Sequence, residues 1–92
     1  MAKFLLLGKY SVDAIKAASA DRTGKALGVI KEAGGQVESM HALLGEYDLA
    51  LMVEFPGISE AVKTSLALTK LTQIAFRTLP AITVEEFDKL IG

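Results

Sequence analysis

The sequence predicts a single small α+β domain whose strands and helices follow one another in the order βαββαβ. Short apolar runs of strand length alternate with longer segments of helical periodicity, and glycine and proline separate them. The chain of 92 residues is long enough for one domain only, so we assign residues 1–92 to it. This order implies a four-stranded antiparallel sheet with both main helices on one face.

The first third of the chain is expected to form a strand followed by an interrupted helix. The apolar run from Lys3 to Tyr10 is too short for a globular helix and suits a buried strand. Ser11 can accept a hydrogen bond from a first-turn N–H group, so a helix should begin after it. The polar and glycine residues of segment 19–24 predict a break, and the pair Gly34-Gly35 ends the helix.

A β-hairpin is predicted in the middle of the chain. The strand-like runs 36–44 and 47–55 are separated by Gly45-Glu46, and a two-residue loop there sets Met40 opposite Leu51. The same register sets His41 opposite Ala50, on the face away from the helices.

The last third adds a helix, a strand and a short tail helix. Ser59 can cap an amphipathic helix over residues 59–71, and residues 73–79 form the fourth strand, which Pro80 ends. Residues 83–86 form a capping box that opens a C-terminal helix. The completed order is that of a ferredoxin-like sandwich.

The sheet face opposite the helices is predicted to be apolar. In the first strand Leu5 and Leu7 alternate with Phe4, Leu6 and Tyr10, so large apolar groups face away from the helices whichever set lies beneath them. Hydrophobic residues make up 51% of the chain, which is high for a small soluble monomer. A contiguous apolar sheet face usually marks an interface, so we expect a homodimer that pairs identical faces around a two-fold axis.

Composition excludes several classes of function. The chain has no cysteine and one histidine, so it lacks the ligands of thiolate or imidazole metal sites, and we expect no metal and no cofactor. The net charge of -1, without a basic stretch interleaved with aromatic residues, argues against a nucleic-acid partner. The apolar run 4–7 is too short to span a membrane or to form a signal-peptide core, so we expect a cytoplasmic protein with no membrane partner.

The segment Gly45-Glu46-Tyr47-Asp48, followed by an apolar strand that ends at Pro56, resembles the GYD domain family. Three further stretches agree with this resemblance over nearly the whole chain, namely residues 4–10, 34–37 and 83–87. The resemblance implies a dimeric α/β barrel, in which two four-stranded sheets meet face to face, and it implies no assigned biochemical role. Relatives by fold include cofactor-free monooxygenases, haem enzymes and ligand-sensing domains of transcription regulators, so the fold does not decide the activity.

Tyr47 and Asp48 are candidates for contact with a ligand at the mouth of such a barrel, or with a second subunit. A structural interpretation competes with this one, because Gly45 permits a turn, Asp48 can bind nearby backbone N–H groups and Tyr47 can pack at the sheet edge. Both interpretations stay open at the level of sequence.

His41, Glu54 and Arg77 are candidates for a polar patch inside a barrel cavity, where they would bind a small polar or anionic ligand. Glu54 lies in an apolar strand and needs a cation if it is buried, which Arg77 or Lys9 could supply as a purely structural ion pair. Histidine is a common general base, but the sequence names no nucleophile beside His41.

Three functions follow from these features. The leading hypothesis is a dimeric, non-enzymatic module that binds a small molecule or only self-assembles. The competing hypothesis is a cofactor-independent enzyme of the monooxygenase or isomerase type that uses His41. The third is a sensor or assembly subunit that acts through a partner protein.

Overall fold

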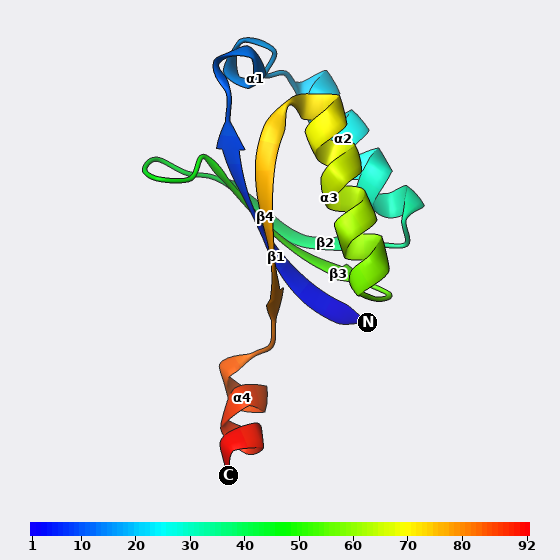
Figure 1. Ribbon diagram of the computed structural model, residues 1–92, viewed down its shortest axis with the longest axis vertical. Helices are drawn as coiled ribbons and strands as arrows, with labels where there is room; N and C mark the ends of the chain where they lie inside the picture. Colours follow the sequence, from blue (N-terminus) through cyan, green and yellow to red (C-terminus); the bar gives the residue numbers. More distant parts are fainter.

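The computed structural model describes residues 1–92 and shows a four-stranded antiparallel sheet with its main helices on one face (Figure 1). The strand order is β2-β3-β1-β4, so β2 and β4 form the edges. The predicted α+β class and βαββαβ order are confirmed. In chain order the elements are β1 (Ala2–Tyr10), α1 (Val12–Lys16), α2 (Ala20–Glu32), β2 (Gln36–Ala42), β3 (Leu49–Phe55), α3 (Ile58–Thr72), β4 (Ile74–Ala81) and α4 (Val84–Ile91).

The predicted hairpin register is confirmed, although the connection between the strands is longer than expected. Met40 pairs with Leu51 and His41 pairs with Ala50. Residues 43–48 form the connection instead of two residues, because β2 ends early and β3 begins late. A β-bulge that the sequence analysis did not foresee leaves Glu38 without a ladder partner.

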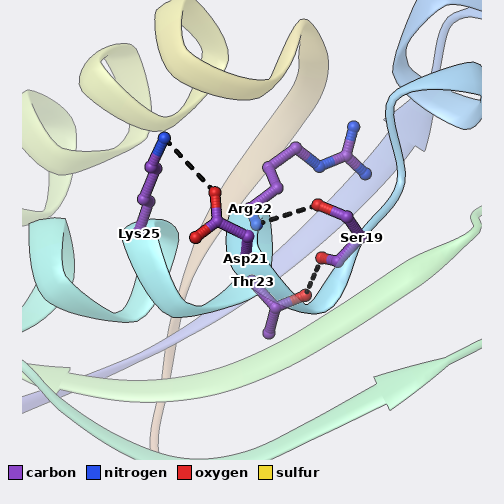
Figure 2. A network of polar contacts seen from close by, with 5 residues as sticks. All are labelled: Ser19, Asp21, Arg22, Thr23 and Lys25. Atoms are coloured by element: carbon purple, nitrogen blue, oxygen red, sulfur yellow. Dashed lines mark hydrogen bonds and ion pairs between the residues drawn. The ribbon is translucent and has the colours of Figure 1, made fainter.

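The first helix is interrupted as predicted, but the break lies at residues 17–19, between α1 and α2, and residues 20–24, where it was expected, are helical. Ser19 caps α2, since its Oγ accepts a hydrogen bond from Arg22 N at 3.0 Å and its carbonyl accepts one from the Thr23 hydroxyl at 3.2 Å (Figure 2). The Arg22 guanidinium donates to the Ala14 carbonyl at 2.5 Å and lies 5.6 Å from the centroid of the Tyr10 ring. One arginine therefore links α1, α2 and the end of β1.

Two element boundaries differ from the prediction. The N-cap of α3 is Gly57, with no side-chain cap, so Ser59 lies inside the helix. Strand β4 continues through Pro80 to Ala81 instead of ending before the proline. Proline is tolerated there because β4 is an edge strand, which needs fewer backbone donors than a central one.

The hydrophobic core lies between the helices and one face of the sheet. Phe4 and Phe55 meet edge to face with ring centroids 6.0 Å apart. Because alternate residues face opposite ways, burial of this set leaves Leu5 and Leu7 on the other face. The side chains exposed by at most 3% in this core are Phe4, Leu6, Ile30, Leu51, Val53, Phe55, Ala61 and Leu68.

Helix α4 extends away from the rest of the molecule (Figure 1). Its predicted cap is confirmed, because Thr83 Oγ1 accepts a hydrogen bond from Glu86 N at 3.1 Å. None of its residues is buried, and Leu90 is 77% exposed. The tail of the chain therefore leaves the second face of the sheet uncovered.

Gly35→Ala should destabilise the fold, because the core has no room for a Cβ atom at this position. That atom would lie 2.7 Å from Phe55 Cε1 and 3.0 Å from the Ile30 carbonyl oxygen. We expect the free energy of unfolding to fall by about 1–3 kcal/mol, measured by urea denaturation at fixed protein concentration.

The matched control is Gly24→Ala in α2, where no atom lies within 4 Å of the added methyl group. Alanine favours the helix, so this variant should gain up to about 1 kcal/mol. Shifts of the same sign in both variants would contradict the packing argument.

Candidate functional site

The face of the sheet away from the helices, called here the open face, carries four rows of side chains set by the strand register. Each row is named after its β1 residue. The two middle rows are apolar at their centre, although His41 and Arg77 stand at the two ends of the Leu7 row, and the two end rows carry charges. From β2 to β4, the Lys3 row is Gln36, Glu54, Lys3, Ala81; the Leu5 row is Ser39, Met52, Leu5, Leu79; the Leu7 row is His41, Ala50, Leu7, Arg77; and the Lys9 row is Asp48, Lys9, Ala75.

The middle of the open face is a contiguous apolar patch formed by Leu5, Leu7, Met52 and Leu79. No helix covers it, and Leu79 is 43% exposed. Single exposed leucines are common on protein surfaces. Met52 and Leu79 are the ladder partners of Leu5, and Leu7 follows two residues later in β1, so the four side chains are neighbours on the same face. Such a patch is typical of an interface.

The end rows carry charges of both signs beside one another. Lys3 is the ladder partner of Glu54, and its Nζ lies 3.2 Å from the Glu38 carboxylate. At the opposite end, Lys9 Nζ lies 3.7 Å from Asp48 Oδ2. The open face is therefore apolar in its middle and carries charges of both signs at both ends.

Asp48 has a structural role that matches one of the two interpretations of the sequence. Its Oδ2 accepts a hydrogen bond from Tyr10 N at 2.9 Å, and its backbone N donates to the Gly8 carbonyl at 2.9 Å. Its own carbonyl accepts a bond from Leu43 N at 2.8 Å. Asp48 thus connects the end of β1 to both arms of the hairpin, and Gly45, with φ +141°, permits the loop before it.

Tyr47 and Arg77, both predicted site residues, line a shared pocket at the Lys9 end of the sheet. The pocket has a volume of about 330 Å³, and its other polar members are Lys9 and Glu46. From the sequence, Lys9 was expected only as a possible partner for Glu54, and the β1–β4 register that brings it here was not predicted. Lys9 already has Asp48 as a partner, and Glu46 adds a negative charge. The cation of this pocket that is left for a small anion is therefore Arg77.

Within one chain His41, Glu54 and Arg77 lie apart on the open face, so the polar patch expected inside a barrel cavity is not formed by a single subunit. His41 and Arg77 share the Leu7 row but lie on opposite edge strands, three spacings of about 4.8 Å apart. Glu54 lies in the Lys3 row, so its nearest cation in the ladder is Lys3 and not Arg77 or Lys9.

The rest of the molecule offers less defined sites. Lys3, Glu54 and Glu86 line an open depression of about 500 Å³ in which both charge signs occur. A cavity of about 50 Å³ lies on the helix side of the sheet, beneath Arg22 and Tyr10, and has room for a few water molecules only. No group of three or more metal-ligating side chains occurs. No helix has the length and hydrophobicity needed to cross a membrane.

Asp48→Ala should weaken the fold, because it leaves the Tyr10 N–H group without its acceptor. We expect a loss of about 1–2 kcal/mol in urea denaturation and faster hydrogen exchange at the Tyr10 amide. Asp48→Asn keeps an acceptor oxygen and loses only the partly exposed pair with Lys9, so it should cost less than about 1 kcal/mol. Equal losses in the two variants would contradict this role.

Comparison with protein families supports the resemblance seen in the sequence. The family model of the GYD domain matches residues 4–91, from the first strand through the C-terminal helix. A comparison with curated proteins finds no match. The matched range contains Gly45, Tyr47 and Asp48, and the positive φ of Gly45 and the hydrogen bonds of Asp48 fix the start of β3. The chain belongs to the GYD domain family.

Proposed function

We propose that this chain works as a homodimeric module that pairs two open faces and binds a small polar or anionic ligand beside that interface. The observation that carries the proposal is the apolar patch of Leu5, Leu7, Met52 and Leu79, which nothing in the chain covers. Two facing sheets pack about 10 Å apart with their side chains interdigitated, so a second copy would remove the patch from water.

Two sizes decide how much pairing would stabilise the chain, namely the area of the apolar patch and the size of the domain. Apolar surface contributes about 25 cal/mol for each Å² removed from water, so covering the patch in both copies stabilises the pair by several kcal/mol. A domain of 92 residues has a small core and gains proportionally more from such cover than a large one does. A two-fold pairing buries the same patch on both subunits, so no further copies of the chain can add through it.

The ligand part of the proposal rests on the pocket lined by Lys9, Tyr47 and Arg77. The pocket lies at the edge of the open face, so a second subunit would cover part of it and leave space for a ligand. Arg77 favours an oxyanion, because a guanidinium group forms charge-assisted hydrogen bonds with carboxylate and phosphate oxygens. Lys9 and Glu46, which also line the pocket, carry opposite charges.

The enzymatic alternative has less support. His41 is exposed on an edge strand, and its ladder partner is Ala50. A general base needs a nucleophile or substrate within hydrogen-bond distance, and no such group stands opposite it in the chain. We therefore favour binding over catalysis.

A second candidate function follows from α4. Val84, Phe87, Leu90 and Ile91 lie on one side of this helix at spacings of three and four residues, and each is at least 50% exposed. An isolated helix of this length is marginal in water, so its apolar side gains from a binding partner. This observation favours an assembly subunit that acts through another protein.

Leu5→Lys should convert the dimer to a monomer, because it puts a charge at the centre of the buried interface. The fold should persist, since Leu5 points away from the core. Light scattering after size exclusion would count the subunits at micromolar concentration. The matched control is Leu66→Lys on α3, where the leucine is 61% exposed on the helix layer and the dimer should be kept. A monomeric wild-type protein would remove the dimer proposal.

Phe87→Ser combined with Leu90→Ser tests the second candidate. Because no residue of α4 is buried, the free energy of unfolding, measured by thermal denaturation, should change by no more than a few tenths of a kcal/mol. If α4 serves a separate protein, the dimer should also persist in light scattering. Loss of the dimer would instead assign α4 to the interface between copies of this chain.

A further inference from the structure

We infer that the two sheets pair around an axis parallel to their strands, and that this pairing sets His41 of the partner subunit over Arg77 to complete an oxyanion site. The inference rests on the proposed dimer and specifies its geometry and the class of its ligand. The observation that supports it is where charged, large and small side chains stand in the four rows of the open face.

Aligned packing with full overlap of the sheets leaves two positions for the two-fold axis. With the axis parallel to the strands, β1 faces the partner's β3, β2 faces the partner's β4, and every row faces the same row. With the axis across the strands, each strand faces its own copy and the order of the rows is reversed, so the Lys3 row faces the Lys9 row. The two arrangements bring different charges together.

The charges favour the first arrangement. With the axis parallel to the strands, Lys3 faces the partner's Glu54 and Lys9 faces the partner's Asp48, and each contact occurs twice. With the axis across the strands, Lys3 faces the partner's Lys9 and Glu54 faces the partner's Asp48. Opposite charges across an interface fix the register, whereas like charges repel.

The sizes of the apolar side chains agree with this arrangement. In the Leu7 row, each Leu7 faces the partner's Ala50, so a large side chain meets a small one. In the Leu5 row, Leu5 faces the partner's Met52, whose unbranched side chain adapts to the available space. Facing sheets interdigitate best when large and small residues alternate across the interface.

The same arrangement brings together the two halves of the polar site. Within one chain, His41 and Arg77 lie at opposite ends of the Leu7 row. Across the interface, Arg77 faces the partner's His41 at the same end of the sheet as the pocket with Lys9 and Tyr47. A dimer therefore contains two equivalent sites, each built from both chains.

The chemistry of this site selects a small oxyanion. Arg77 offers a planar set of donors that matches two oxygens of a carboxylate or phosphate. Lys9, paired with Asp48, and Glu46 line the same pocket with opposite charges, so Arg77 is the group that holds the anion. The Tyr47 hydroxyl and the imidazole of the partner subunit's His41 add polar contacts from two further directions. The pocket volume of about 330 Å³ accommodates phosphate or a short carboxylic acid and leaves room for a larger ligand that carries such a group.

A subunit complementation experiment tests the site. His41→Ala and Arg77→Ala homodimers should each bind inorganic phosphate at least several-fold more weakly than the wild type in calorimetric titration. A purified heterodimer of the two variants pairs intact Arg77 with an intact His41 of the partner subunit, so one of its two sites should recover wild-type affinity.

Acetate in a parallel titration distinguishes a carboxylate site from a phosphate site. Lys63→Ala on α3 removes the same charge elsewhere and should bind phosphate like the wild type.

A charge-reversal experiment tests the axis independently. Lys3→Glu should weaken the homodimer several-fold, because it faces the partner's Glu54, and mixing it with Glu54→Lys should form a tight heterodimer. With the axis across the strands, Lys3→Glu would face the partner's Lys9 and tighten the homodimer instead. Lys3→Gln should shift the dissociation constant in the same direction by a smaller factor, which guards against a folding defect in the reversal variant.

The outcomes separate this inference from the proposed function. A wild-type monomer in analytical ultracentrifugation would remove both. A wild-type dimer in which Lys3→Glu binds more tightly, or in which the heterodimer of His41→Ala and Arg77→Ala does not recover phosphate binding, would overturn the inference and leave the dimer standing.

Discussion

The two-residue repeat of a β-strand is the constraint on which the structure depends. Every strand has two faces, and the two main helices of this chain cover only one of them. In β1 both faces are apolar, so burial of Phe4 and Leu6 beneath the helices necessarily turns Leu5 and Leu7 to the other side. The same alternation therefore decides which β1 side chains pack beneath the helices and which lie on the open face, and a shift in one set would shift the other.

Much of the fold was predictable from the sequence because its signals are local. The serine before α1, the glycine pair after α2 and the turn residues between β2 and β3 act within a few positions of themselves. The hairpin register followed from Gly45-Glu46 even though the loop is longer. Pro80 misled the prediction because its tolerance depends on β4 being an edge strand, which the local sequence does not reveal.

The candidate site was less predictable, because it depends on registers between strands that are distant in the chain. The hairpin register correctly assigned His41 to the face away from the helices, but only the registers of all four strands decide which rows His41, Glu54 and Arg77 occupy. For this reason the sequence suggested Arg77 or Lys9 as the cation beside Glu54, whereas its ladder partner is Lys3. Lys9 was not recognised as part of the Tyr47 and Arg77 pocket, since nothing near it in the sequence indicates that β4 lies beside β1.

The bulge at Glu38 and the proline in β4 have a joint consequence for how copies of this chain can meet. Both lie on edge strands, where unpaired backbone groups invite a further strand from another molecule. An unpaired bulge residue interrupts that row of groups on β2, and Pro80 offers no N–H donor on β4. The addition of a strand from another molecule is therefore disfavoured at both edges of the sheet.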